Sequence, residues 1–465
     1  MIFEDVSIHL SESSKLSERS LSTTLAFTSR VIGTTFAFCL FTFSLFAQPK
    51  DNSPYSRLGL GEPVNHTLSS AGFGGLSAAY ADPLHVNLLN PASLGWLGAT
   101  TFEAGVFFEN STIQFDDETT KVRTGNLNHL SLAFPMRNSL NDVLLKRKPK
   151  FFWSMNLALL PNTTVGYNIE TEDVLPGVDT VLNSFQGTGG TNKLLIGNGF
   201  RYKNFTWGLN LGYLFGQLEN HREVEFTDLT ASYTDIFLDN ISVRGFLWNL
   251  GVQYRHDFDK KKSEDEFYSG RSLVIGAYGN SATNFKTKND VVRIRQNEDY
   301  APVHRDTLFI EEDQKRSGKL PAEFTFGLMY QHTAKLRIGA EFGFANWSNY
   351  ENEVKPEALF NSRRLAAGIE YIPDYSSYNN YLRRIRYRAG FYHRTDPRLE
   401  DLTQYAVTLG FGLPVILPRQ QTSFVNLAFE LGQYDTPNAI KETFIKIALG
   451  FSLNDTSWFF KRKFG

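Results

Sequence analysis

Residues that could carry out chemistry are few in this 465-residue chain. A lipase would need a serine and a histidine brought together from neighbouring strands, and His129 and Ser131, which lie in one expected strand, do not make such a pair alone. No glycine-rich phosphate loop joins a strand to a helix, and no Gly-x-Ser-x-Gly turn occurs. The sequence therefore predicts no enzyme.

Metal and cofactor chemistry have equally little support in the sequence. The nine histidines lack a paired spacing typical of zinc sites, and Asp116-Asp117-Glu118 lacks the further oxygen ligands that calcium requires. The single cysteine, Cys39, lies in a segment that we expect to be removed on export. A net charge of −2 argues against a nucleic-acid surface. We expect no metal, no cofactor and no nucleic-acid partner.

Aromatic residues and glycine dominate the composition. The chain has 40 Phe, 20 Tyr and 36 Gly, with 21% charged residues and a mean hydropathy of −0.28. This mixture is too polar for a helical membrane protein and unusually aromatic for a soluble one. It is typical of outer-membrane barrels, whose strands face lipid on one side and a polar lumen on the other, with aromatic girdles at both interfaces. No change of composition separates two domains.

From residue 100 onward, apolar residues alternate with small or polar ones, as in strands with two different faces. In 336–344 the second face consists of Arg337, Gly339, Glu341 and Gly343, and in 205–215 it is Thr206, Gly208, Asn210 and Gly212. A soluble sandwich would carry more charge and less glycine on its polar face. We expect strands near 100–109, 126–135, 150–172, 189–201, 205–217, 243–256, 271–281, 319–331, 335–345, 363–373, 386–396, 402–413, 421–432 and 442–453.

This count is fourteen, an even number as bacterial single-chain barrels require. Long links are expected outside the cell at 110–125, 173–188, 218–242, 282–318, 346–362 and 433–441, and tight turns such as Lys203-Asn204 are expected in the periplasm. Three inner links, 136–149, 257–270 and 374–385, are longer than this rule predicts. The expected fold is all-β: one fourteen-stranded antiparallel transmembrane β-barrel, here 99–453, with an N-terminal plug in its lumen.

The segment before the barrel is not a strand. Small residues crowd its start, and the turn signals Asp82-Pro83 and Asn90-Pro91 bracket its second half. A Gly-rich linker would be polar throughout, whereas this segment also carries Phe73, Leu76 and Trp96. We therefore expect a compact plug within 48–98. Its motif residues are Gly72, Gly74, Gly75, Asp82, Asn90, Pro91 and Ala92.

The order Gly74-Gly75, Asp82, Asn90-Pro91-Ala92-Ser93-Leu94 and then a strand from Thr100 resembles the N-terminal hatch of FadL-type outer-membrane transporters of long-chain fatty acids, and of their Bacteroidota relatives. The segment from Asn52 to Gly61 looks like the mature N-terminus of a Bacteroidota branch of that superfamily. The resemblance implies an outer-membrane barrel that takes up hydrophobic molecules passively.

The third expected strand, 150–172, is unusually long and holds Pro161 in its middle. Proline lacks the N–H that a sheet needs, so it is tolerated only at an edge or a bulge. We expect one strand interrupted at Leu160, Pro161 and Asn162. In FadL-type transporters a kink in the third strand opens the wall sideways, so the resemblance implies a lateral opening here. A simple bulge or a tight turn is the alternative.

The two ends of the chain carry export and anchoring signals. An apolar run at 31–47 after Arg30 suits a signal peptide cleaved after Ala47, with a translation start assigned too far upstream; an uncleaved anchor is the alternative. The last segment, 454–465, has Trp458 beside Lys461 and is expected to be a periplasmic tail. The protein is thus expected in the bacterial outer membrane.

Two functions are compatible with these features. One is FadL-like passive uptake of hydrophobic small molecules such as long-chain fatty acids. The other is a non-transporting scaffold or carrier barrel in a Bacteroidota secretion or barrel-assembly complex. The expected partners are outer-membrane lipid and lipopolysaccharide, a hydrophobic ligand for the first function and a protein partner for the second. A continuous apolar path from the outer loops to Pro161 would favour uptake, and a sealed lumen would favour the scaffold.

Overall fold

The computed structural model describes residues 53–58, 67–115, 118–137, 141–142, 145–146, 149–176, 179–227, 232–259, 270–297, 304–332, 334–417, 421–436 and 440–457. These all belong to one compact unit, Lys50–Gly465. The signal peptide, Cys39, Asp116-Asp117 and the tail from Trp458 lie outside the described residues, so what was expected of them stays a prediction. No helix within the described ranges is long and apolar enough to cross a membrane.

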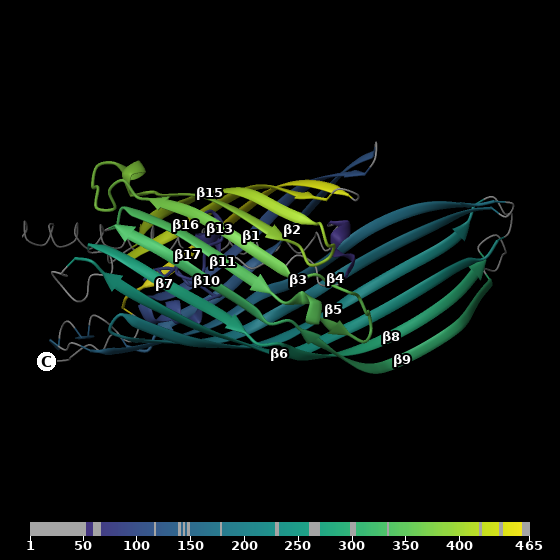
Figure 1. The fold of residues 1–465 in the computed structure, drawn as a ribbon, viewed down its shortest axis with the longest axis horizontal. Helices are drawn as coiled ribbons and strands as arrows, with labels where there is room; N and C mark the ends of the chain where they lie inside the picture. Colours follow the sequence, from purple (N-terminus) through teal and green to yellow (C-terminus); the bar gives the residue numbers. More distant parts are fainter. Residues whose placement is uncertain are drawn as a thin grey trace, which may run out of the picture. The chain divides into compact units, whose positions relative to one another are not determined.

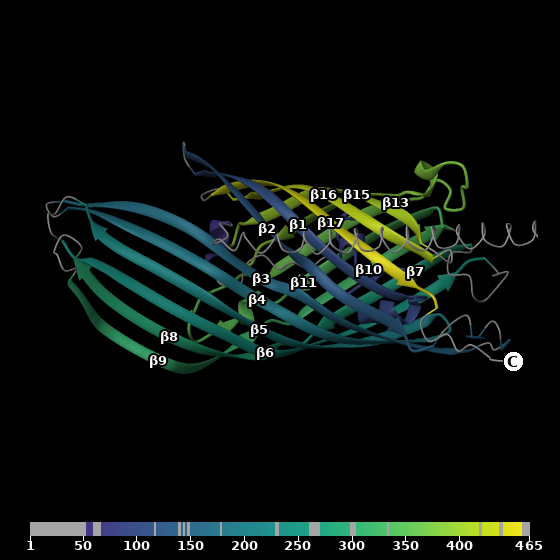
Figure 2. The ribbon, with the colours of Figure 1, turned by 180° about the vertical axis from the view of Figure 1, so that it is seen from behind.

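Fourteen antiparallel strands form the closed barrel that the sequence predicts (Figure 1). Pairing of the first strand with the last closes the circle, from Thr100 with Asp455 to Gln114 with Lys441 (Figure 2). The barrel strands are β1 Thr100–Phe115, β2 Glu118–Pro135, β3 Phe151–Leu175, β4 Asp179–Tyr202, β5 Phe205–Phe226, β6 Thr234–Asp257, β7 Arg271–Asn280, β10 Glu323–His332, β11 Leu336–Ala345, β13 Ser362–Tyr371, β14 Arg386–Thr395, β15 Thr403–Leu417, β16 Gln421–Asp435 and β17 Lys441–Asp455.

The alternation of apolar with small or polar residues matches the two faces of each strand, one outward and one toward the lumen. On β5, Trp207, Leu211 and Phe215 are exposed, whereas the intervening Thr206 and Asn210 are buried in the lumen. Outward apolar side chains suit lipid, and inward small or polar ones leave room for a plug. The short turn between β4 and β5, where Lys203 has φ of 54°, lies at the inner, periplasmic end by the usual asymmetry of such barrels.

The expected outer links are largely strands, and this corrects the sequence analysis. Residues 282–318 form a hairpin, β8 Thr283–Asn297 and β9 His304–Leu320, and a short strand β12 Glu351–Asn352 pairs with β9. β8 pairs with the outer half of β6, whereas the inner half of β6 pairs with the next barrel strand, β7. These strands were missed because a strand outside the membrane has no lipid-facing apolar side: Lys286 and Lys288 occupy outward positions of β8.

The hairpin belongs to a sheet in which the outer halves of β3, β4, β5 and β6 continue beyond the membrane. We call these outer halves, together with β8, β9 and β12, the outer sheet. Outward side chains change from Phe215 to Gln217 on β5 and from Phe246 to Arg244 on β6. Lipid contact therefore ends there. Figure 1 shows β8 and β9 running well past the ends of β10 and β11.

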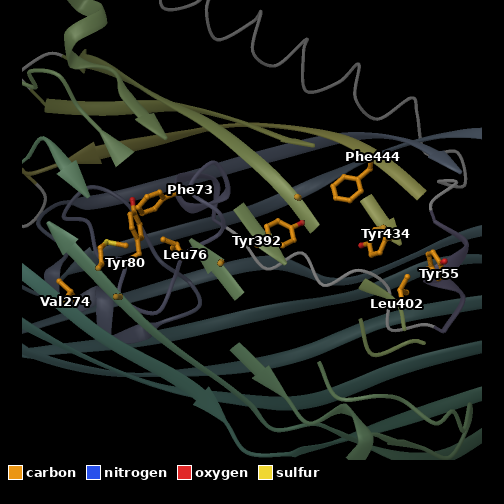
Figure 3. Close-up of a cluster of buried hydrophobic side chains, with 13 residues drawn as sticks. Tyr55, Phe73, Leu76, Tyr80, Val274, Tyr392, Leu402, Tyr434 and Phe444 are labelled. Atoms are coloured by element: carbon orange, nitrogen blue, oxygen red, sulfur yellow. The ribbon is translucent and has the colours of Figure 1, made fainter. Parts of the chain in front are cut away.

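Short helical turns account for the remaining regular structure. Three belong to the segment before the barrel: η2 Pro54–Leu58, α2 Leu68–Ala71 and η3 Pro91–Trp96. Two lie in links: η4 Trp347–Asn349 and η5 Tyr381–Arg384. A buried cluster follows the lumen from Phe73 and Tyr80 in the plug to Tyr55 and Tyr434 near the outer end (Figure 3). The N-terminal segment thus contributes the barrel's main apolar core.

Candidate functional site

The glycines of the plug let its backbone lie directly on the barrel wall. Gly74 and Gly75 have φ of 69° and 68°, values that side chains other than glycine rarely adopt. A Cβ on Gly72 would stand 2.4 Å from Gly410 Cα of β15, and one on Gly74 would stand 2.7 Å from the Ala367 carbonyl oxygen of β13. The predicted small residues are therefore required by close packing.

Two asparagines tie the plug to itself. Asn90 donates to the Ala78 carbonyl at 2.6 Å and accepts from Ala92 N–H at 3.0 Å, which caps η3. Asn87 donates to the carbonyls of Ser77 at 2.7 Å and Tyr80 at 3.0 Å. Its own oxygen also accepts two backbone N–H groups, from the residues at positions 89 and 90. The sequence singled out Asn90 but missed Asn87.

The wall makes room for this turn with glycines. Pro91 and Asn90 lie against inward-facing glycines of β4, β5 and β6, where an added Cβ would meet plug atoms within 3 Å. These wall residues are Gly199, Gly208 and Gly251. Asn210 of β5 also donates to the Leu88 carbonyl at 2.9 Å. The plug motif and the polar face of the strands are thus complementary surfaces.

Asp82 fastens the plug to the opposite wall through buried ion pairs. Its carboxylate is 2.9 Å from Arg337 of β11 and 2.7 Å from Arg386 of β14. Burial alone would raise the pKa of Asp82, but Arg386 and Arg337 hold it well below its usual range. Glu370 of β13 joins the network, 3.2 Å from Arg337 and 2.7 Å from Arg388.

A second wall carboxylate holds the start of the plug. Glu341 of β11 accepts the backbone N–H groups of Ser77 at 2.7 Å and Ala78 at 3.0 Å, and is paired with Arg364 of β13. Arg364 also donates to the Gly74 carbonyl. The sequence placed Arg337 and Glu341 on the polar face, but their partners could not be foreseen because they come from distant parts of the chain.

Near β1 the plug meets a carboxylate shared by two histidines. Glu103 lies 3.1 Å from His85 Nδ1 of the plug and 3.6 Å from His129 Nε2 of β2, and accepts from Ser452 Oγ at 2.8 Å. Ser131 is buried on the same inner face as His129. No hydrogen bond between Ser131 and His129 is formed in the described structure.

The residues ahead of the plug form a strap, Ser53–Ser56, at the outer end of the lumen. Ser53 donates to Glu442 of β17 at 2.5 Å, and the Tyr55 hydroxyl donates to the Ile440 carbonyl. Burial raises the pKa of Tyr55 to about 12, so the hydroxyl keeps its proton. Tyr55 also packs on Tyr434, with ring centroids 5.9 Å apart.

The wall beside the strap is open between β2 and β3. These strands pair only from Pro135 with Ser154 to Leu130 with Leu159, although both continue outward. Beyond that point the described residues of β2 and β3 form no ladder. The Ser56 hydroxyl occupies the β3 edge, accepting from Gly166 N–H at 3.1 Å and lying 3.2 Å from its carbonyl oxygen.

Pro161 lies where the gap begins. β3 is one strand through this point, and its register against β4 shifts between Pro161 and Thr163. Leu160 packs with plug residues such as Leu88, and Asn162 donates to Thr191 at 3.0 Å. On β4 the distortion continues at Gly189, with φ of 108°.

Two cavities meet at this gap. The lumen cavity, about 330 Å³, reaches Asn128 of β2 and Asn162 and Thr163 of β3. An outer hollow of about 610 Å³ is lined by Asn126, Pro161 and Thr163. Thr163 lines both. The lining at the junction combines amides and hydroxyls with the apolar side chains of Leu160 and Pro161, so the gap is partly polar and partly apolar.

Solved structures of the same fold are channels. The Ralstonia pickettii toluene transporter TbuX has 12% identity and a TM-score of 0.51, covering 85% of this chain and 99% of that chain. A Pseudomonas aeruginosa FadL homologue has 12% identity and a TM-score of 0.53, with the same coverage. The deltaS2S3 mutant of the monoaromatic hydrocarbon channel TodX has 15% identity and a TM-score of 0.52, covering 84% and 99%. At these identities the likeness establishes the FadL-type, outer-membrane fold.

Comparison with family models is more specific than comparison of folds. A search of the curated proteins finds no match. The model described as BamG matches residues 30–465, which include the strap, the plug and every barrel strand. The chain belongs to the BamG family.

Proposed function

We propose that this chain is a transmembrane subunit of an outer-membrane protein complex and receives a partner outside the membrane. The observation that carries the proposal is the outer sheet, a large polar extension on a barrel whose lumen holds a plug. At about 3.3 Å per residue, the part of β3 beyond Pro161 alone spans roughly 45 Å along the strand. A sheet of this size is not needed to hold a pore in lipid.

The closure of the lumen supports the same proposal. Asp82 holds the plug through ion pairs and Glu341 holds it through hydrogen bonds from the plug backbone, and the strap residue Ser56 occupies the wall gap. The family name BamG points in the same direction, to an outer-membrane complex. A secretion or barrel-assembly complex like those of Bacteroidota relatives is the specific form that we propose.

Gentle extraction from native membranes followed by native mass spectrometry tests this function. We expect the full-length barrel with a stoichiometric partner protein, and loss of that partner when the hairpin β8–β9 is replaced by a short turn between Asn280 and Glu323. The control is a barrel with a substituted inner link, 374–385, which keeps the partner. A barrel that is always alone and fully active in uptake would overturn the proposal.

Uptake of amphipathic molecules through the gap is the second candidate function. It is favoured by the meeting of both cavities at Thr163 and by two lumen charges. Lys193 of β4 and Glu323 of β10 line the lumen cavity and attract each other electrostatically, although no ion-pair contact joins them among the described residues. The other charged lining residues have closer partners, as when Lys446 pairs with Glu109 at 2.9 Å. A ligand bound between Leu88 and Leu160 would meet both charges.

A covalent block of the gap tests uptake. Asn126→Cys and Thr164→Cys place one thiol on each side of the gap, to be joined by a short bis-maleimide. We expect uptake of a fluorescent long-chain fatty acid into proteoliposomes to fall at least five-fold after bridging. The control is the same variant treated with hydrolysed reagent. Unchanged uptake after complete bridging would exclude this route.

A further inference from the structure

The last strand of the outer sheet presents an unpaired edge. β9 pairs with β8 from Leu320 with Thr283 to His304 with Asn297, and its register shifts at two bulges, one at Leu308 and one at Glu312 and Asp313. On its other side β12 reaches only Gly318 and Lys319. Among the described residues, no strand pairs with that side from 304 to 316. Backbone N–H and C=O groups are therefore unpaired there, in short regular stretches that the two bulges separate.

An apolar patch lies in the middle of this edge. Leu308, Phe309 and Ile310 are 55%, 48% and 57% exposed. Natural edge strands are protected by being short, by charged residues or by proline, and a long edge with exposed apolar residues pairs readily with another chain. This position is beyond the lipid-facing part of the barrel, so lipid does not cover it.

Carboxylates bracket the apolar patch. Asp306 precedes it beside the exposed Arg305, and Glu311 and Glu312 follow it; none of these carboxylates forms an ion pair among the described residues. Arg293 and Arg295 of β8 are engaged elsewhere, since they pair with carboxylates of β6 at 2.9 Å and 2.6 Å. The edge therefore offers an apolar centre with negative charge at the end that carries Glu311 and Glu312.

We propose that β9 binds an extended segment of another protein, apolar in its centre and carrying Lys or Arg where it meets Glu311 and Glu312, as an added antiparallel strand. The proposal rests on the proposed function, whose partner it describes by chemistry. Backbone hydrogen bonds supply the attachment, and the charges of Glu311 and Glu312 select the partner. A second copy of this chain fits poorly, because antiparallel pairing centred on Phe309 would put Asp306 opposite Glu312.

The test uses the full-length barrel in nanodiscs and a fluorescent decapeptide of alternating Val and Thr with two Lys at each end. We expect saturable binding by anisotropy, and slower amide exchange in β9 on binding. Glu311→Lys with Glu312→Lys should weaken binding at least ten-fold and confer binding of the matched peptide with Glu at its ends. Val174→Glu, at an exposed position of β3, is the control and should bind as the parent does.

Three results would overturn the inference. The first is no binding at millimolar peptide, and the second is equal binding of the Lys and Glu peptides by both the parent and the doubly substituted barrel. The third is a rate of amide exchange in β9 that stays unchanged when the peptide binds. Retained melting temperature checks that each variant is folded. If a partner protein co-purifies with the barrel but the peptide does not bind, the inference fails and the proposed function stands. If the peptide binds but no partner co-purifies, the edge is a strand-binding site and the proposed function fails.

Discussion

The hydroxyl of Ser56 stands where a neighbouring strand would pair with Gly166. It accepts the Gly166 N–H at 3.1 Å and lies 3.2 Å from the carbonyl oxygen of the same residue. A residue's N–H and C=O point to the same side of a strand, so this side is the edge that β2 leaves open. One side chain from the strap thus completes the wall.

Removing this hydroxyl should loosen the edge of β3. In Ser56→Ala the N–H and the carbonyl oxygen of Gly166 each lose a hydrogen bond, together worth about 2 kcal/mol, equivalent to roughly thirty-fold faster local opening. Hydrogen exchange of residues 163–169 should rise by that factor. Ser111→Ala, whose hydroxyl makes only a 3.5 Å contact with Glu109 on β1, is the matched control. Equal exchange in Ser56→Ala and the parent would mean that the strap does not hold the gap.

Asp82→Asn should release the plug from the wall between β11 and β14. The change removes the carboxylate that Arg337 and Arg386 share and leaves Glu370 as a carboxylate partner of Arg337; removing one partner of a buried pair typically costs about 3–5 kcal/mol. We expect a lower melting temperature and new conductance steps in planar bilayers. Asp259→Asn, at an exposed pair with Arg271, should change neither. An Asp82→Asn barrel that shows no new conductance steps and has an unchanged melting temperature would contradict the role of Asp82.

Moderate acid should leave this attachment intact. Because the folded-state pKa of Asp82 is lowered, its contribution is complete above the unfolded-chain pKa of about 3.9 and is lost only as pH falls through the lower folded value. Conductance of the parent barrel should therefore be the same at pH 7.5 and pH 5. Opening at pH 5 would assign the control of the plug to another group, such as Glu103 with His85 and His129.

Gly74→Ala should destabilise the plug more than an ordinary glycine substitution. The residue has φ of 69°, and the new Cβ would stand 2.7 Å from the Ala367 carbonyl oxygen. We expect a loss of about 2 kcal/mol or more in thermal unfolding. Gly343→Ala serves as the comparison, because its nearest contact would be Thr325 Oγ1 at 3.3 Å. Equal effects of the two substitutions would contradict the close contact at Gly74.

Asn87→Ala should cost more stability than Asn90→Ala. Asn87 makes four side-chain hydrogen bonds inside the plug and Asn90 makes two. At about 1 kcal/mol for each bond, the difference in unfolding free energy should be near 2 kcal/mol. Parallel denaturation of both variants in one detergent measures it. A larger loss in Asn90→Ala would show that the cap of η3 matters more than the ties of Asn87.

The barrel itself could be predicted because lipid imposes a simple rule on its strands. Alternation in segments such as 205–215 places one face outward. The number of strands is even because the chain enters and leaves the barrel on the periplasmic side. That rule ends at the membrane surface. Beyond Phe215 and Phe246 the outward face of each strand meets water instead of lipid, although the inward face still buries residues such as Phe285 of β8. The strands β8 and β9 therefore lack the lipid-facing pattern, and their sequence predicts a loop.

The candidate site was predictable only where local chemistry limits the backbone. Glycine pairs, Asn90-Pro91 and Pro161 mark tight packing, a cap and a bulge in any context. The charged residues that hold the plug form ion pairs with partners hundreds of residues away in the sequence, as Asp82 does with Arg386. No local spacing in the sequence indicates such a pair. Asn87 was missed because its partners are backbone carbonyls, which every residue possesses.

The contact between Ser53 and Glu442 constrains the order in which the chain is assembled. The two residues are 389 positions apart, and Glu442 lies on the strand that closes the barrel against β1. Loop closure over such a distance is slow and entropically costly, so this bond forms late. The plug that follows the strap contacts β4, β5 and β6 on one side of the lumen and β11, β13 and β15 on the other, so the pairing of β17 with β1 encloses it between them. The wall is thus completed around the N-terminal segment.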